Sequence, residues 1–125
     1  MTSCYFFNNT AVRAGALRFE LQNTNIIISN TSFVSNTGLS TVGAVGFTFS
    51  NQDIVIVNCE FIDNYGVNNA GGVRFFDGNM NIEIIDCIFR ENESLFSGGG
   101  LALYYNNFNF KILSTIFEGN VLLTG

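Results

Sequence analysis

One motif recurs along the whole chain with a period of about 28 residues. In each copy a Phe is followed three positions later by an Asn, and successive Phe residues are separated by 27, 28, 28 and 28 positions. A repeat of this length indicates an architecture in which similar units stack on one another. The repeated residues are Phe6, Phe33, Phe61, Phe89 and Phe117, followed by Asn9, Asn36, Asn64, Asn92 and Asn120.

Each copy also carries a glycine motif and an alternating apolar segment. Short segments of β character separated by Asn- and Gly-rich turns, with no helical periodicity, predict three short strands per copy. We therefore expect an all-β, single-stranded parallel β-helix (a solenoid), with rungs 4–30, 31–58, 59–86, 87–114 and a partial rung 115–125. The glycine motifs are "GAL" at Gly15, "GAV" at Gly43, "GGV" at Gly71 and "GGL" at Gly99, and the alternating segments start at Ile26, Ile54, Ile82 and Phe110.

Stacking in register predicts columns of like residues through the solenoid. Alternation along "LRFEL" places Leu17, Phe19 and Leu21 inside, with Arg18 and Glu20 outside. Repeated Asn residues at the turns are expected to hydrogen-bond from rung to rung, which makes them structural. Further columns are Asn23, Asn51, Asn79 and Asn107; Asn25, Asp53, Asn81 and Asn109; and Cys4, Thr31, Cys59, Cys87 and Thr115.

The paired motifs F-x-x-N and G-G-[AG]-[ILV] resemble the repeats of chlamydial polymorphic outer-membrane proteins and related β-helical surface proteins. The resemblance rests on "FVSN" from Phe33, "FIDN" from Phe61, "FREN" from Phe89 and "FEGN" from Phe117, and covers the whole chain. It implies a right-handed, pectin-lyase-like parallel β-helix in an extracellular or cell-surface protein, with adhesion as a common role. It supplies no catalytic residues.

Composition excludes several classes of function. The chain has no His, which removes the commonest metal ligand and general base at neutral pH. Five Lys and Arg residues against ten Asp and Glu argue against a nucleic-acid partner. Apolar runs are too short for a transmembrane helix, and no pattern predicts a metal or cofactor.

An enzyme of the pectate-lyase kind is an alternative, because such sites place carboxylates on one outer face of adjacent rungs. The candidate pair is Asp63 and Glu91, with Glu60 and Glu118 nearby. These residues also lie at turns where polar side chains are expected for structural reasons.

A partner-binding surface is predicted at Arg74, Phe76 and Tyr104. Phe76 and Tyr104 share an outward column and offer aromatic rings to a sugar or a protein, with Arg74 beside them. The alternative is an ordinary cross-rung aromatic pair. Glu83 and Lys111 are expected to form a surface ion pair in another outward column.

Cys59 and Cys87 are expected to be reduced thiols that pack beside the Phe column, one rung apart. Three N-x-[ST] triplets begin at Asn8, Asn30 and Asn92. Only Asn8 and Asn30 are candidates for glycosylation, because Asn92 belongs to the predicted ladder.

Four segments between the Phe-Asn and glycine motifs differ most between copies and form one edge of the stack: "TAVRA", "TGLSTV", "YGVNNA" and "ESLFSG". Such an edge often binds partners in repeat proteins. We expect a structural or adhesive segment whose partners are flanking rungs, identical subunits, or a host or cell-surface protein or glycan. Without predicted caps, the chain is expected to belong to a longer solenoid or to stack with copies of itself into a filament.

Overall fold

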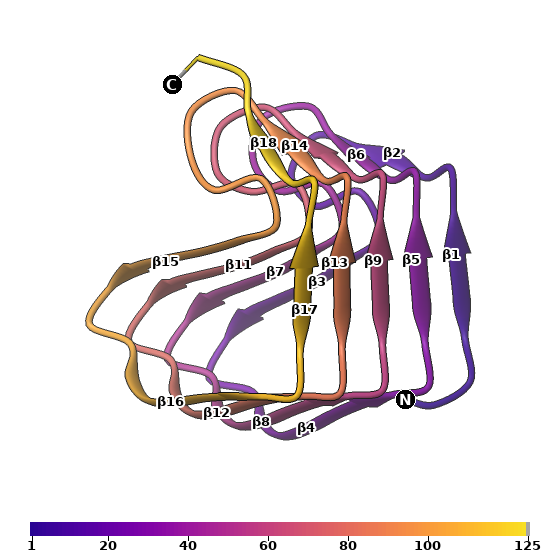
Figure 1. Ribbon diagram of the computed structural model, residues 1–125. Helices are drawn as coiled ribbons and strands as arrows, with labels where there is room; N and C mark the ends of the chain where they lie inside the picture. Colours follow the sequence, from indigo (N-terminus) through magenta and orange to yellow (C-terminus); the bar gives the residue numbers. More distant parts are fainter. Residues whose placement is uncertain (125) are drawn as a thin grey trace.

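The computed structural model describes residues 1–124, and these form a stack of β rungs without a helix (Figure 1). Each strand pairs in parallel with the equivalent strand of the next rung, so that four parallel sheets run along the stack. Single-residue register is kept throughout, as in the pairing of Phe33 with Phe61 and of Ile54 with Ile82. The predicted β-solenoid is therefore confirmed.

The four sheets correspond to four positions in the repeat. One contains β1 (Tyr5–Phe7), β5 (Ser32–Val34), β9 (Glu60–Ile62), β13 (Ile88–Arg90) and β17 (Ile116–Glu118). The second contains β2 (Thr10–Ala11), β6 (Thr37–Gly38), β10 (Tyr65–Gly66), β14 (Glu93–Ser94) and β18 (Val121–Leu122). The third contains β3 (Leu17–Leu21), β7 (Val45–Phe49), β11 (Val73–Asp77) and β15 (Leu101–Tyr105), and the fourth β4 (Thr24–Ser29), β8 (Gln52–Val57), β12 (Met80–Ile85) and β16 (Phe108–Leu113).

The second of these sheets was not predicted, since the sequence indicates three strands per rung and the structure has four. Its strands are two residues long and directly follow the Asn of the Phe-Asn motif. Two residues cannot show the alternation from which a strand is recognised, and pairing with the neighbouring rung defines them instead.

The core consists of columns of identical side chains. Phe6, Phe33, Phe61, Phe89 and Phe117 stack with neighbouring ring centroids 4.6 to 5.0 Å apart. Offset stacking at this spacing adds to the stability gained from burying the rings. Ile54, Ile56, Ile82 and Ile84 are fully buried on the inner face of the fourth sheet.

Two asparagine ladders run beside the Phe columns. Asn64 shows the pattern: its Oδ1 accepts from the backbone N and the Nδ2 of Asn36 at 2.9 and 3.0 Å. Its Nδ2 donates to the carbonyl of Phe33 and to Oδ1 of Asn92, both at 2.9 Å. Every polar atom of a fully buried amide is thus satisfied, and the same bonds recur in the ladder of Asn23, Asn51, Asn79 and Asn107.

The glycine motif allows close contact between backbones of adjacent rungs. A Cβ on Gly71 would lie 2.5 Å from the carbonyl oxygens of Asn64 and Gly99 and 2.6 Å from the backbone N of Glu93. No side chain fits there, because all three neighbours are backbone atoms. Stacking itself therefore requires Gly at this position.

The predicted inward direction of Leu21 is wrong. Leu21 is exposed, as is Phe49, its partner in the next rung. The chain turns immediately after each of them, where Gln22 and Ser50 have φ values of 55° and 54°. The two side chains thus lie at a corner and do not cover the core.

The connections between the second and third sheets fold back over the outer face of the third sheet (Figure 1). Val42 and Ala70 from these connections are buried in a small second cluster with Ala102 of β15. Ala14 and Tyr104 pack against this cluster. The variable segments therefore cover one sheet in addition to forming an edge.

Replacing Asn64 by Ala is expected to lower the free energy of unfolding by about 3 kcal/mol or more, because it removes the acceptor of the buried backbone N of Asn36 and the side-chain donor to the carbonyl of Phe33. Urea denaturation followed by circular dichroism measures this change. Asn68→Ala is the control, since Asn68 is exposed and makes one side-chain bond, and should cost less than about 1 kcal/mol. Equal losses in the two variants would contradict the structural role of the ladder.

Candidate functional site

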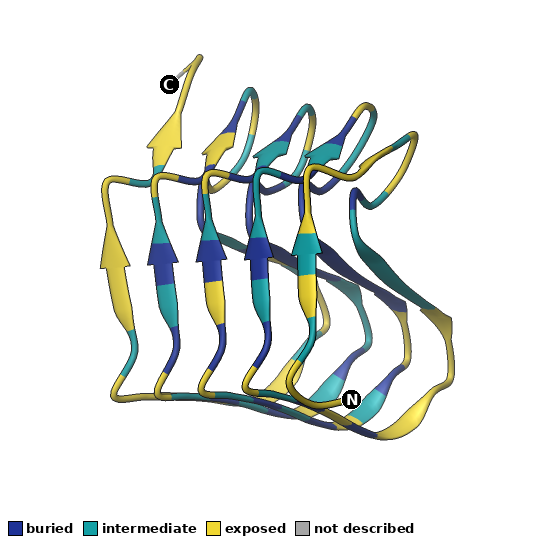
Figure 2. Ribbon diagram, turned by 90° about the vertical axis from the view of Figure 1, so that its right-hand side faces the viewer, coloured by how far each residue is buried: buried dark blue, intermediate teal, exposed yellow. Residues whose placement is uncertain are grey.

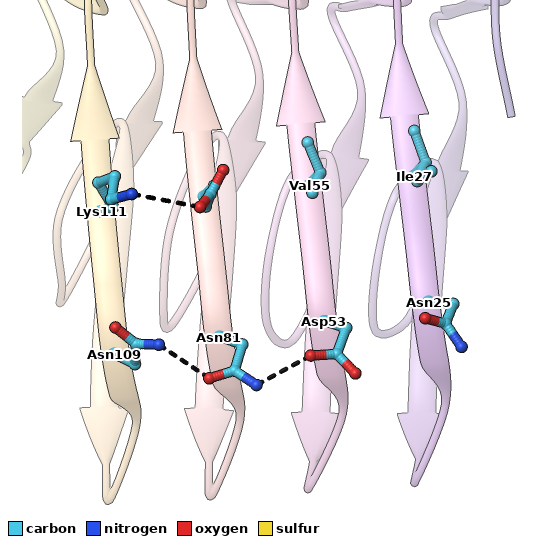
Figure 3. A pocket seen from close by; sticks show the side chains of 8 residues that line it. Asn25, Ile27, Asp53, Val55, Asn81, Asn109 and Lys111 are labelled. Carbon is cyan, nitrogen blue, oxygen red and sulfur yellow. Dashed lines mark hydrogen bonds and ion pairs between the residues drawn. The ribbon is translucent and has the colours of Figure 1, made fainter.

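A pocket of about 350 Å³ lies on the outer face of the fourth sheet. Figure 3 shows its lining as two outward columns that cross four rungs. One column is polar and lies where the strands bend, with φ values of 53° to 55° that Asn and Asp tolerate better than most residues. The columns are Asn25, Asp53, Asn81 and Asn109, and Ile27, Val55, Glu83 and Lys111.

Hydrogen bonds within the pocket run in one direction along the stack. Nδ2 of Asn109 donates to Oδ1 of Asn81 at 2.9 Å, and Nδ2 of Asn81 donates to Oδ1 of Asp53 at 2.8 Å (Figure 3). In the second column Lys111 Nζ lies 3.4 Å from Glu83 Oε1, which confirms the predicted ion pair. The pocket thus combines amides, both signs of charge and an apolar end, a set able to bind a polar chain by hydrogen bonds.

The outward column of Arg74 had suggested that this residue lies on a free surface, but the residue is buried. Only 7% of the residue is exposed, because the connection 67–70 folds over it. Its Nη1 donates to Oδ1 of Asn69 in that connection, and its Nε is buried without a hydrogen-bond partner. Burial, together with the like charge of Arg18, lowers the pKa of Arg74 below its ordinary value.

The other two residues of the predicted surface do lie beside Arg74. The guanidinium carbon is 4.7 Å from the ring centroid of Phe76, and the rings of Phe76 and Tyr104 are 5.7 Å apart. The Tyr104 hydroxyl accepts from Asn69 at 3.0 Å and donates to Ser97 at 2.6 Å. Arg74, Asn69, Tyr104 and Ser97 therefore form one hydrogen-bonded chain that links two rungs, and with Phe76 we call them the Arg74 cluster.

The candidate catalytic residues Asp63 and Glu91 lie at one exposed corner, with φ values of 54° and 53°. Oδ2 of Asp63 accepts from the Ser35 hydroxyl at 3.1 Å. Glu60 similarly accepts from Ser32, and Glu118 pairs with Arg90. Within residues 1–124 no hydrogen bond joins Asp63 to Glu91, and neither lines the pocket.

Cys59 and Cys87 are free and buried beside the Phe column, while Cys4 is half-buried. The sulfur of Cys87 contacts the carbonyl oxygen of Ile85 at 3.2 Å. The neighbouring Cys59 side chain and burial raise the pKa of the Cys87 thiol well above its ordinary value. Of the sequons, Asn8 and Asn30 are exposed and Asn92 is fully buried.

Among residues 1–124, no group of three or more Cys, Asp or Glu side chains is arranged to hold a metal ion. The same part of the chain has no helix of the length and hydropathy needed to cross a membrane.

Sequence reasoning found the ladders, the ion pair and three residues of the Arg74 cluster, but it missed the pocket and the cluster's other two members, Asn69 and Ser97. The pocket was missed because its Asn column was interpreted as structural, although a recurring Asn or Asp two residues before an outward column of Ile27, Val55, Glu83 and Lys111 was visible. Nothing in the sequence indicated that Asn69 and Ser97 reach Tyr104, because both lie in the variable segments.

The three cysteines of the chain should differ in reactivity toward a water-soluble disulfide reagent. We expect one thiol, Cys4, to react in the folded protein, and all three to react in denaturant, because Cys59 and Cys87 are buried. Raising the pH to about 9 should leave this stoichiometry unchanged, since burial keeps the reagent away from Cys59, whose pKa is lowered by its contact with Cys87, and from Cys87, whose pKa is raised. Absorbance of the released thiolate gives the count, and three reactive thiols in the native state would contradict the packing.

The chain matches a family model described as "Right handed beta helix region" over residues 1–121. No curated protein and no solved structure matches it. The description names a fold and no activity, and its extent includes every rung of the stack. The chain belongs to the right-handed β-helix family.

Proposed function

We propose that this chain is a non-enzymatic structural and adhesive β-helix segment of an extracellular or cell-surface protein. The observation that carries the proposal is the unbroken pair of asparagine ladders, which join every rung to the next through buried amides. A stack held in this way is stiff along its axis, since bending would break bonds that water cannot replace. The resemblance of the Phe-Asn and glycine motifs to those of chlamydial surface proteins supports the location.

The variable edge is the surface proposed for adhesion. Its sequence changes from rung to rung while the ladders below it stay constant. Leu39 is 55% exposed and Phe96 is 60% exposed within two of its connections. Exposed apolar and aromatic side chains held on a rigid scaffold are typical of protein interfaces.

We expect beads coated with the chain to attach to cultured epithelial cells and the double variant Leu39→Ser, Phe96→Ser to attach about tenfold less. Both side chains are exposed, so the variant should keep the circular dichroism and urea midpoint of the parent. Bead counts per cell under flow give the comparison.

The matched control is Tyr5→Ser, Ile116→Ser, which removes two exposed apolar side chains from the outer face of the first sheet. This control should attach within about twofold of the parent. Equal loss in both variants would show general stickiness, and absence of attachment by the parent would reject an adhesive role toward these cells.

A second candidate function is end-to-end assembly into filaments. Much of the last described rung is coloured as exposed in Figure 2. Its core-facing residues Leu103, Ile112 and Phe117 are 45%, 40% and 45% exposed. Unpaired strands with such a face can pair with the first rung of another copy.

Filament formation should appear as fibres in electron micrographs that increase with protein concentration. Phe117→Lys should suppress them, because it places a charge in the proposed contact. The control Phe96→Lys changes the variable edge and should assemble normally. A monomer at the highest attainable concentration would reject this candidate.

Polysaccharide cleavage is the remaining alternative. Several carboxylates are already held by neighbouring side chains, and this argues against their acting as a general acid or base. Asp63 accepts from Ser35, Asp53 accepts from Asn81, and Glu83 pairs with Lys111. Incubation with polygalacturonate should therefore release no unsaturated or reducing ends. Turnover that is lost in Asp63→Asn or Glu91→Gln would overturn the non-enzymatic assignment.

A further inference from the structure

Arg74 carries a positive charge that the described part of the chain does not neutralise. The chain has five Lys and Arg residues, and within residues 1–124 each of the others pairs with a glutamate. Arg74 is also the least exposed of them, at 7%. An unpaired buried charge is costly, and a ligand that brings the opposite charge would offset this cost.

The free edge of the guanidinium has the geometry for a carboxylate. Nη1 of Arg74 is used by Asn69, which leaves Nε and Nη2 on the other edge. Nε is buried without a partner. Nη2 also makes no hydrogen bond within residues 1–124. Unlike Nε, it is not buried, so it reaches solvent. Nη2 is therefore the guanidinium nitrogen that a carboxylate from outside can reach, through a charge-assisted hydrogen bond.

The surroundings hold this edge in place. The Phe76 ring supports the guanidinium, and Asn69 is itself fixed by its bond to Tyr104. In the neighbouring rungs Arg74 pairs with Gly46, which has no side chain, and with Ala102, which has a small one, and this leaves room for the long Arg74 side chain. A side chain fixed before binding loses little entropy when it binds.

We propose that Arg74 binds the carboxylate of an Asp or Glu side chain in an exposed segment of a partner protein, through Nη2. The inference rests on the proposed function as a binding segment and names the chemistry of its partner. Phe76 and Tyr104 beside Arg74, with the exposed Tyr105, are residue types enriched at protein interfaces. The net charge of −5 disfavours a polyanion, whereas one carboxylate flanked by apolar groups suits the site.

The probe is the blocked dipeptide acetyl-Phe-Glu-amide, titrated into the ¹⁵N-labelled chain while the Arg74 Nε–H resonance is followed by NMR. We expect a saturable shift of this resonance. The matched probe acetyl-Phe-Gln-amide has the same shape without the charge and should bind about tenfold more weakly, because it cannot form charge-assisted hydrogen bonds.

Two variants test the site from opposite directions. Arg74→Met removes the guanidinium, and backbone resonances of Phe76 and Tyr104 should then no longer respond to the dipeptide. Asn69→Asp keeps Arg74 and places a carboxylate next to Nη1, so it should weaken the dipeptide about tenfold and raise the melting temperature. Arg90→Met is the control, since Arg90 is paired with Glu118, and it should bind as the parent does.

Absence of a saturable shift in the parent, or unchanged binding by Asn69→Asp, overturns the proposal. If the Arg74 Nε–H resonance reports tighter binding of glucuronate than of the dipeptide, the ligand is an acidic sugar and the protein partner is rejected. If cell attachment persists while the dipeptide fails to bind, only this inference fails. If the dipeptide binds and attachment is absent, the adhesive function fails and the carboxylate site stands.

Discussion

The side-chain amide bonds between rungs are the constraint on which the rest of the structure depends. Each buried Asn, as Asn64 shows, accepts two hydrogen bonds from one neighbouring rung, and its Nδ2 donates both to the other rung and to a carbonyl of the first. A shift of one residue between rungs would place a different side chain opposite each amide and leave several buried groups unsatisfied, at a cost of about 1–3 kcal/mol each. Register is therefore fixed by polar groups, and the apolar core follows from it.

Once register is fixed, each core position sees a copy of itself above and below. Phe33 and Phe61 have ring planes 3° from parallel, as expected when identical residues occupy the same rotamer on adjacent rungs. The same repetition explains the glycine motif. Gly43 faces the carbonyl of Gly71, and Gly71 faces that of Gly99, so a side chain at any one copy would separate two rungs.

The sequence could therefore predict what repeats, but not what departs from the repeat. The 28-residue period of the sequence predicts the Phe and Asn columns and the Glu83–Lys111 pair. The path of the connections 39–42 and 67–70 does not follow from this period, because the sequence of each occurs only once and has neither alternation nor a turn signature. Burial of Arg74 depends on that path, and so its outward position in the strand was misleading about its environment.

This division also bears on where function resides. In a stack of equivalent rungs, a residue shared by all copies serves the stacking, whereas a binding site needs a rung that differs from its neighbours. The column of Arg74 contains Arg18, Gly46 and Ala102. Arg18 pairs with Glu20, which also pairs with Arg13, but the corresponding residue in the rung of Arg74 is Phe76. Replacing the acid by an aromatic ring keeps the guanidinium supported and removes its counterion, which leaves the charge available to a partner.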